Sequence, residues 1–220
     1  MEQVVRDMVG RSITEYYPGR TNEPGEIVLE VKNFCQDGLF NNISFKLRKG
    51  EILGVAGLMG AGRTEIMRAL FGVDSCKHGE VYLHGKKVCI KKPEDAIKAG
   101  IGFITENRKS EGLILDFSIS RNIALPSVDT FAKRSVINAK NETAFSEALS
   151  KKLGVKTASI DLEAGALSGG NQQKVVIAKW IGMNPSIIIM DEPTRGIDVG
   201  AKRDIYDLMN ELTSQGVAII

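Results

Sequence analysis

The sequence predicts an α/β fold, in which short buried strands alternate with amphipathic helices. Apolar runs such as residues 187–190 are short and are typical of buried strands. Segments such as residues 64–71 instead place apolar side chains at helical spacing on one face. A glycine-rich turn at residues 57–62 separates an apolar run from this helix, which gives the strand–loop–helix order expected of an α/β protein.

The composition is that of an ordinary globular protein. The 220 residues are 43% hydrophobic and 25% charged, and they suit one domain or a domain with a subdomain. A formal net charge of +2 is too balanced to predict a nucleic-acid partner. No apolar run approaches the ~20 residues that span a bilayer, and the N-terminus lacks the apolar core of a secretory signal. We therefore expect a cytosolic protein that contacts membranes only through partners.

Residues 1–25 are expected to form a linker, because residues 15–25 contain two prolines and two glycines. From residue 27 the pattern favours strands, at residues 27–31 and 43–47. Residues 51–56 then form a short apolar run, which predicts a buried strand leading into the glycine-rich turn.

The remaining elements are expected in the following order. The helix at residues 64–71 ends at Gly72; a hairpin (81–90), a helix (93–98) and a strand (101–104) follow. Residues 112–165 are helix-rich, with no clear strand. A strand ends at Asp191, a helix covers residues 201–212, and the chain stops inside a further strand at residues 217–220. A domain that ends in a strand is expected to be C-terminally truncated.

The glycine-rich turn nearly fits a phosphate-binding loop. Such loops follow the pattern Gly-x4-Gly-Lys-Ser/Thr, in which backbone N–H groups converge on phosphate oxygens, lysine adds charge and the hydroxyl binds Mg²⁺. Gly57, Gly62 and Thr64 occupy their positions, but Arg63 replaces lysine. Arginine keeps the charge but is bulkier, planar and forked. The candidate nucleotide-binding residues are Gly57, Leu58, Met59, Gly60, Ala61, Gly62, Arg63, Thr64 and Glu65, with Thr64 also a candidate Mg²⁺ ligand.

A second glycine turn, Ser168-Gly169-Gly170, opens the amphipathic helix that contains Gln172. A hydroxyl and free N–H groups at a helix N-terminus form an anion-binding arrangement. The plainer alternative is that Ser168 only caps the helix. Downstream, the apolar run at residues 187–190 ends in Asp191 and Glu192, where a carboxylate can hold Mg²⁺ through a bound water.

These three motifs, in this order, resemble the nucleotide-binding domain of ABC transporters. The versions Gly-Leu-Met-Gly-Ala-Gly-Arg-Thr-Glu and Asp-Glu-Pro-Thr-Arg-Gly-Ile-Asp-Val-Gly-Ala resemble the second cassette of tandem bacterial ATPases that import simple sugars. The resemblance covers nearly the whole chain. It implies a P-loop NTPase cassette at residues 26–220, with a RecA-like core, an antiparallel β subdomain and an α-helical subdomain inserted at about 112–165. Residues 8–18 then resemble the connector from a preceding cassette; a free N-terminal arm is the alternative.

The resemblance also implies roles for individual residues. Glu192 is expected to be the general base that polarises the attacking water, and Asp191 an Mg²⁺ ligand. Asp198 matches an aspartate that crosses the dimer interface. Glu106 stands where the family usually has a glutamine that contacts Mg²⁺ and couples to the membrane subunit; a charged surface loop is the alternative. Adenine usually stacks on an aromatic side chain, but Phe34 and Phe40 are better interpreted as core residues.

The expected function is to bind and hydrolyse ATP with Mg²⁺ and so power carbohydrate import from the cytoplasmic face of the cell membrane. Ser168, Gly169, Gly170 and Gln172 are expected to close over ATP held by a partner cassette. Membrane permease subunits and, indirectly, a sugar-binding protein are the other expected partners, and no nucleic acid is expected. Arg63 and Glu106 motivate an alternative, a regulatory cassette with little hydrolysis that completes its partner's site. A cassette protein of translation or DNA repair is a third, weaker hypothesis.

Overall fold

A computed structural model describes residue 19 and residues 22–133 and 136–220. The expected connector at residues 8–18 lies outside them. The strands are β1 Ile27–Gln36, β2 Phe40–Arg48, β3 His78–Leu83, β4 Lys86–Val88, β5 Ile101–Ile104, β6 Ala132–Lys133, β7 Val136–Ile137, β8 Ile187–Met190 and β9 Ala218–Ile219. The α-helices are α2 Arg63–Phe71, α3 Pro93–Lys98, α4 Ile119–Ala124, α5 Val128–Phe131, α6 Ala139–Lys152, α7 Gly169–Ile181 and α8 Val199–Ser214. A π-helical turn, η1 Arg108–Gly112, and two short 3₁₀ turns, η2 Leu125–Ser127 and η3 Ala164–Ala166, complete the list.

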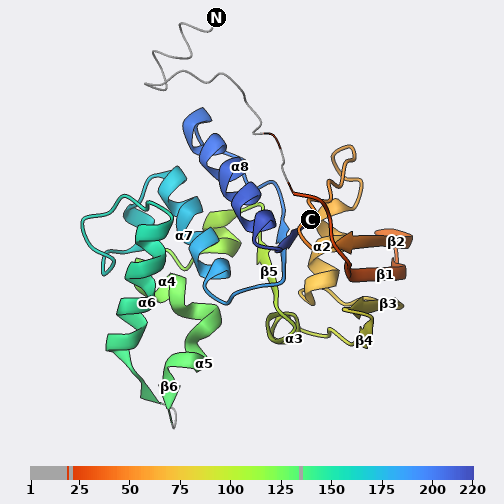
Figure 1. Ribbon diagram of the computed structural model, residues 1–220, viewed down its shortest axis with the longest axis horizontal. Helices are drawn as coiled ribbons and strands as arrows, with labels where there is room; N and C mark the ends of the chain where they lie inside the picture. The colour runs from red at the N-terminus through yellow and green to blue at the C-terminus, as the bar shows by residue number, and fades with distance from the viewer. Residues whose placement is uncertain (1–18, 20–21, 134–135) are drawn as a thin grey trace, which may run out of the picture.

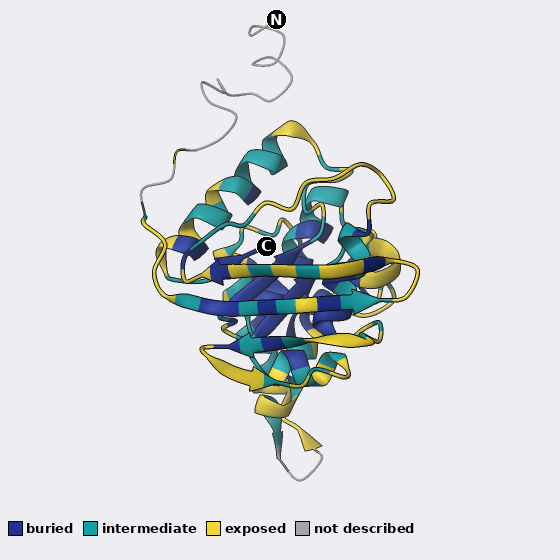
Figure 2. Cartoon of the chain, turned by 90° about the vertical axis from the view of Figure 1, so that its right-hand side faces the viewer, coloured by how far each residue is buried: buried dark blue, intermediate teal, exposed yellow. Residues whose placement is uncertain are grey.

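An antiparallel sheet, in the order β2-β1-β3-β4, forms one side of the molecule (Figures 1 and 2). Val31 pairs with Phe45 on β2 and with Val81 on β3. The expected hairpin is confirmed: β3 and β4 are joined through His84 and Gly85, both at positive φ, as a two-residue hairpin turn requires.

A parallel sheet in the order β5-β8-β9 lies at the centre of the molecule. Its strands are buried on both faces, which explains their unbroken apolar sequences. Ile104 pairs with Met190, so β5 and β8 end side by side. The loops that follow them, residues 105–107 and 191–198, therefore begin at the same edge of the sheet.

The expected strand at residues 51–56 is wrong. Only Ile52 pairs, as a single parallel bridge to Ile219, and Val55 is 40% exposed. The physical reason is that, in the described part of the chain, these residues lack a neighbouring strand with which to form hydrogen bonds. The N–H of Leu53 still donates to the carbonyl oxygen of Ile219 at 2.8 Å, but within the described residues no strand pairs with residues 54–56.

Helices α4, α5 and α6 lie on the side of the molecule opposite the antiparallel sheet, with the short hairpin of β6 and β7 at one end (Figure 1). That hairpin was not expected, since two residues per strand are too few to produce a pattern. Helix α7 links this group to the centre: Trp180 on α7 packs against Gly102 of β5, where an added Cβ would lie 3.3 Å from the Cβ of Trp180.

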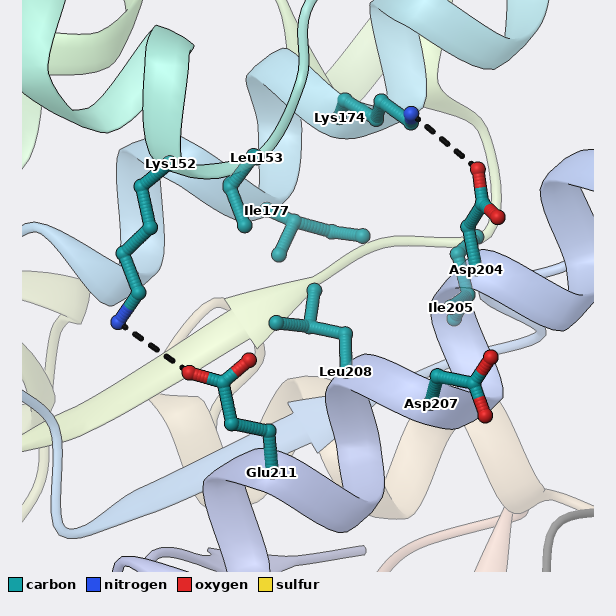
Figure 3. A pocket seen from close by; sticks show the side chains of 9 residues that line it. All are labelled: Lys152, Leu153, Lys174, Ile177, Asp204, Ile205, Asp207, Leu208 and Glu211. Carbon is teal, nitrogen blue, oxygen red and sulfur yellow. Dashed lines mark ion pairs between the residues drawn. The ribbon is translucent and has the colours of Figure 1, made fainter.

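Helix α8 lies beside α7 and the C-terminal end of α6. Between them is a cleft of about 250 Å³ with a floor that includes Leu153, Ile177 and Leu208 (Figure 3). Ion pairs cross it from Lys152 to Glu211 and from Lys174 to Asp204. No helix within the described residues combines the length and apolar character needed to cross a membrane.

Candidate nucleotide site

The glycine loop is an irregular turn between the bridge at Ile52 and helix α2. Gly62, at φ 84°, precedes the helix, and an added Cβ there would lie 3.2 Å from the carbonyl oxygen of Leu39. At Gly57 an added Cβ would lie 3.0 Å from the Cβ of Ala61. Leu58 and Met59 are 86% and 100% exposed. The loop is thus tightly folded at Gly57 and Gly62 and open to solvent at its tip.

Arg63, the first residue of α2, lies opposite Glu192, with 3.6 Å between Nη2 and Oε1. The two sequence motifs that carry them are 129 positions apart by number, and the sheet edge brings them together. Glu192, in the turn after β8, has φ 46°, an uncommon conformation for a non-glycine residue. Its neighbour Asp191 has a buried Oδ2 with no hydrogen-bond partner.

Two arginines that the sequence analysis did not single out connect the loops after β5 and β8. Arg195 forms an ion pair with Glu106. Arg108 donates hydrogen bonds to the carbonyl oxygens of Arg195 (3.0 Å) and Gly196 (3.2 Å). A signal was available: each arginine follows a predicted site carboxylate, Glu106 or Glu192, by two or three positions.

The Ser-Gly-Gly turn begins α7, but Ser168 forms no capping hydrogen bond with its side chain. Its hydroxyl accepts a hydrogen bond from Nδ2 of Asn171 at 3.1 Å. The plain capping interpretation is therefore not supported. Added Cβ atoms at Gly169 and Gly170 would lie 3.5 Å from the carbonyl oxygen of Gly196 and 3.6 Å from Asp198 Oδ2, so both glycines face the loop after β8. Gly169 also faces Arg108, whose Nη2 would lie 2.7 Å from an added Cβ.

Two other predicted site residues have structural contacts of their own. Oδ1 of Asp198 accepts a hydrogen bond from the backbone N–H of Ala201 (2.9 Å) and caps α8. Gln172 is only 3% exposed; its amide nitrogen donates to the carbonyl oxygen of Ala164 (3.3 Å), and its amide oxygen has no partner. Gln172 thus lies beneath the Ser-Gly-Gly turn, not on its surface.

Phe34 and Phe40 are core residues, as expected: they are 4% and 9% exposed and stack with ring centroids 5.6 Å apart. The turn between β1 and β2 carries a hollow of about 470 Å³ lined by residues 35–41. This hollow adjoins the glycine loop through the contact of Leu39 with Gly62. Leu39, 50% exposed, offers it an apolar side chain.

The chain is similar to known proteins. The family model described as ABC transporter matches residues 40–195. Ribose import ATP-binding protein RbsA of Bacillus licheniformis is 59% identical over 218 residues, which cover 99% of this chain and 44% of that protein. The protein of the same name from Bacillus subtilis is 60% identical over 219 residues, which cover 100% of this chain and 44% of that protein. The chain therefore spans less than half the length of these relatives.

Two solved structures share the fold. The ATP-binding cassette MJ0796, in a dimeric post-hydrolysis state bound to ADP and Pi, has a TM-score of 0.72 at 23% identity, covering 87% of this chain and 85% of that chain. The ATP-binding cassette MJ1267 in its ADP conformation has a TM-score of 0.70 at 24% identity, covering 88% and 79%. The P-loop cassette fold expected from the motifs is confirmed.

Proposed function

This chain belongs to the ABC transporter family, and from that premise we propose that it binds and hydrolyses ATP to drive carbohydrate import. The names of the ribose import relatives support this substrate class and make ribose the first sugar to test. The observation that carries the ATPase proposal is the meeting of Arg63 and Glu192. It joins the glycine loop to the carboxylate that follows β8.

The residues at this edge fit a magnesium nucleotide. Asp191 Oδ2 is a buried carboxylate oxygen without a hydrogen-bond partner, and a hard cation prefers such an oxygen. Thr64 adjoins Arg63 and would supply a hydroxyl ligand. Mg²⁺ bound there would neutralise negative charge on the phosphates. Glu106 is the third candidate Mg²⁺ ligand, but its ion pair with Arg195 must open or shift before Glu106 could bind the ion.

In the proposed reaction, residues 57–65 hold the phosphates with backbone N–H groups, and the charge of Arg63 faces them. Glu192 accepts a hydrogen bond from the attacking water and orients it. The nucleotide must compete with Glu192 for Arg63, because these two side chains face each other at 3.6 Å. Phosphate binding therefore frees the carboxylate that the reaction uses.

We further propose that the chain is one cassette of a pair, the second of a tandem polypeptide. Its 44% coverage of the relatives supports a single cassette. Ser168, Gly169 and Gly170 would then cover the partner's nucleotide, with Asp198 at the interface. Residues 1–25 would be the connector, and residues 112–165 the helical subdomain. Permease subunits and a sugar-binding protein would complete the transporter, with this chain on the cytoplasmic face of the membrane.

The second candidate is a regulatory cassette that binds nucleotide and hydrolyses little. The same Arg63–Glu192 pair favours it, because a general base held by a guanidinium is less available to water. The first candidate predicts that Arg63 turns to the phosphates when ATP binds. The second predicts that the ion pair persists.

Single-turnover hydrolysis of ATP by the full-length polypeptide that contains this chain separates the candidates. We expect Glu192→Gln to reduce the rate of this site on the order of 10²-fold or more while ATP binding persists. Glu94→Gln, at an exposed glutamate in the first turn of α3, is the matched control. Equal rates for wild type and Glu192→Gln would favour the regulatory cassette.

A further inference from the structure

Arg108 and Arg195 reach across the same gap in opposite directions. Arg108, after β5, donates to the carbonyl oxygens of residues 195 and 196, after β8. Arg195 reaches back to Glu106, after β5. We propose that these two arginines form a clamp that positions Glu192 and Asp198 relative to Glu106 and the Ser-Gly-Gly turn, with Arg108 as its main positioning residue. The clamp deepens the proposed ATPase function and rests on it.

Strand order creates the gap that the clamp bridges. Strands β5 and β8 are parallel neighbours, and the N–H of Asp191 donates to the carbonyl oxygen of Ile104 at 2.8 Å. Beyond this bond the segments that follow β5 and β8 leave the sheet as loops. The arginines are the described residues whose side chains reconnect these loops.

The backbone turn that carries Arg108 is held by hydrogen bonds at both ends. Arg108 begins the π-helical turn η1, whose start is capped by Asn107: its side-chain oxygen accepts from the N–H groups of Lys109 and Ser110, at 3.2 and 3.3 Å. At the other end, buried Lys179 of α7 donates to the carbonyl oxygen of Gly112. π-Helical turns are rare in proteins, and those that occur are often found at functional sites. These hydrogen bonds fix the backbone from which the Arg108 side chain extends to its two acceptors.

The guanidinium also touches the Ser-Gly-Gly turn. A Cβ added to Gly169 would lie 2.7 Å from Arg108 Nη2, so only glycine lets the guanidinium lie there undisturbed. A cation at a helix N-terminus is unfavourable, because the helix dipole is positive at that end. Arg108 therefore lies there because the two carbonyl oxygens hold it, and not because α7 attracts it. One side chain from the Glu106 loop thus contacts two other predicted motifs, the loop after β8 and the Ser-Gly-Gly turn.

The clamp transmits position to the proposed catalytic carboxylate. The N–H of Arg195 donates to the carbonyl oxygen of Glu192 at 3.0 Å, closing the turn that begins at Glu192. Gly196, at φ 66°, turns the chain toward Asp198 at the start of α8. Holding residues 195 and 196 therefore holds the turn that carries Glu192 on one side and Asp198 on the other.

The test compares Arg108→Ala, Arg108→Lys and the control Arg121→Ala in the full-length polypeptide. Arg121 is exposed on α4 and lies over the Phe117 ring, away from the clamp. We expect kcat to fall on the order of 10- to 100-fold in Arg108→Ala, with the Kd for ATP and the Tm close to wild type, because two charge-assisted hydrogen bonds are lost. Arg108→Lys, which keeps one donor, should recover part of the rate. A kcat within twofold of wild type in Arg108→Ala would overturn the clamp.

Hydrogen exchange tests the clamp without relying on catalysis. In Arg108→Ala the amide of Arg195 should exchange at least about tenfold faster, while amides of β8 stay protected. If wild type hydrolyses no ATP yet this exchange change appears, the proposed function fails and the clamp stands. If wild type is active and the exchange is unchanged, the clamp fails and the function stands.

Discussion

Arg63 occupies the position where phosphate-binding loops carry lysine, and its guanidinium faces Glu192. A lysine ammonium is compact, whereas the planar guanidinium reaches farther and binds carboxylates with two donors. We expect Arg63→Lys to release Glu192 and to raise single-turnover hydrolysis about tenfold or more. Arg68→Lys is the control; Arg68 lies on the same helix as Arg63 and pairs with Asp74, which follows the helix. An unchanged or lower rate in Arg63→Lys would contradict this account of Arg63.

Burial of Lys179 makes the stability of the protein depend on pH. Lys179 is 6% exposed on α7, and burial lowers its pKa from 10.5 to about 8. The unfolded chain therefore holds this proton between pH 8 and 10.5 while the folded chain has released it, so stability rises with pH in that window. Between pH 7.5 and 9.5 the free energy of unfolding of wild type should rise about 2 kcal/mol more than that of Lys179→Met. Urea titrations at the two pH values measure this, and parallel pH profiles would contradict it.

At the scale of the elements, Gly72 fixes where α2 ends. It has φ 81°, and an added Cβ would lie 2.8 to 2.9 Å from backbone atoms of Lys92. Gly38 has a similar φ of 73° but nothing within 4 Å of an added Cβ. We expect Gly72→Ala to cost about 3 kcal/mol of stability and Gly38→Ala about 1 kcal/mol, since the second suffers only the left-handed conformation. Equal losses by denaturant unfolding would mean that the backbone of Lys92 moves away freely.

Elements with local signals were predictable. The helix that ends at Gly72, the hairpin around His84-Gly85 and the buried strand before Asp191 each depend on periodicity or turn residues within a few positions. Residues 51–56 had an equally apolar sequence and were wrongly expected to form a strand. A strand needs a hydrogen-bonded neighbour along its length, and this segment has only the single bridge of Ile52 to Ile219.

At the scale of the whole molecule, α8 joins the site to the helical side across the cleft of Figure 3. The ion pairs that cross it are partly exposed, so each contributes below about 1 kcal/mol. Ile205 on α8 is 3% exposed, so burial holds the helix. We expect Ile205→Ala to cost about 2–4 kcal/mol and Lys152→Met below about 1 kcal/mol. Denaturant unfolding compares them; a larger loss in Lys152→Met would show that charge, not packing, secures α8.

The sequence by itself determined the fold family and most of its elements. The glycines, the Ser-Gly-Gly turn and the Asp191-Glu192 pair are local patterns, and each is recognisable without knowing what surrounds it. The sequence also showed that Arg63 replaces the lysine of a phosphate-binding loop. Only the tertiary structure decided what each side chain meets.

Arg63 faces Glu192, Arg195 holds Glu106, and Arg108 joins three motifs, because β5 and β8 are neighbours and end at one edge of the sheet. Gln172, expected at the nucleotide, is buried beneath its turn. These contacts depend on strand order and side-chain reach between positions far apart in the chain. No local pattern encodes either, so packing alone settled which charges meet.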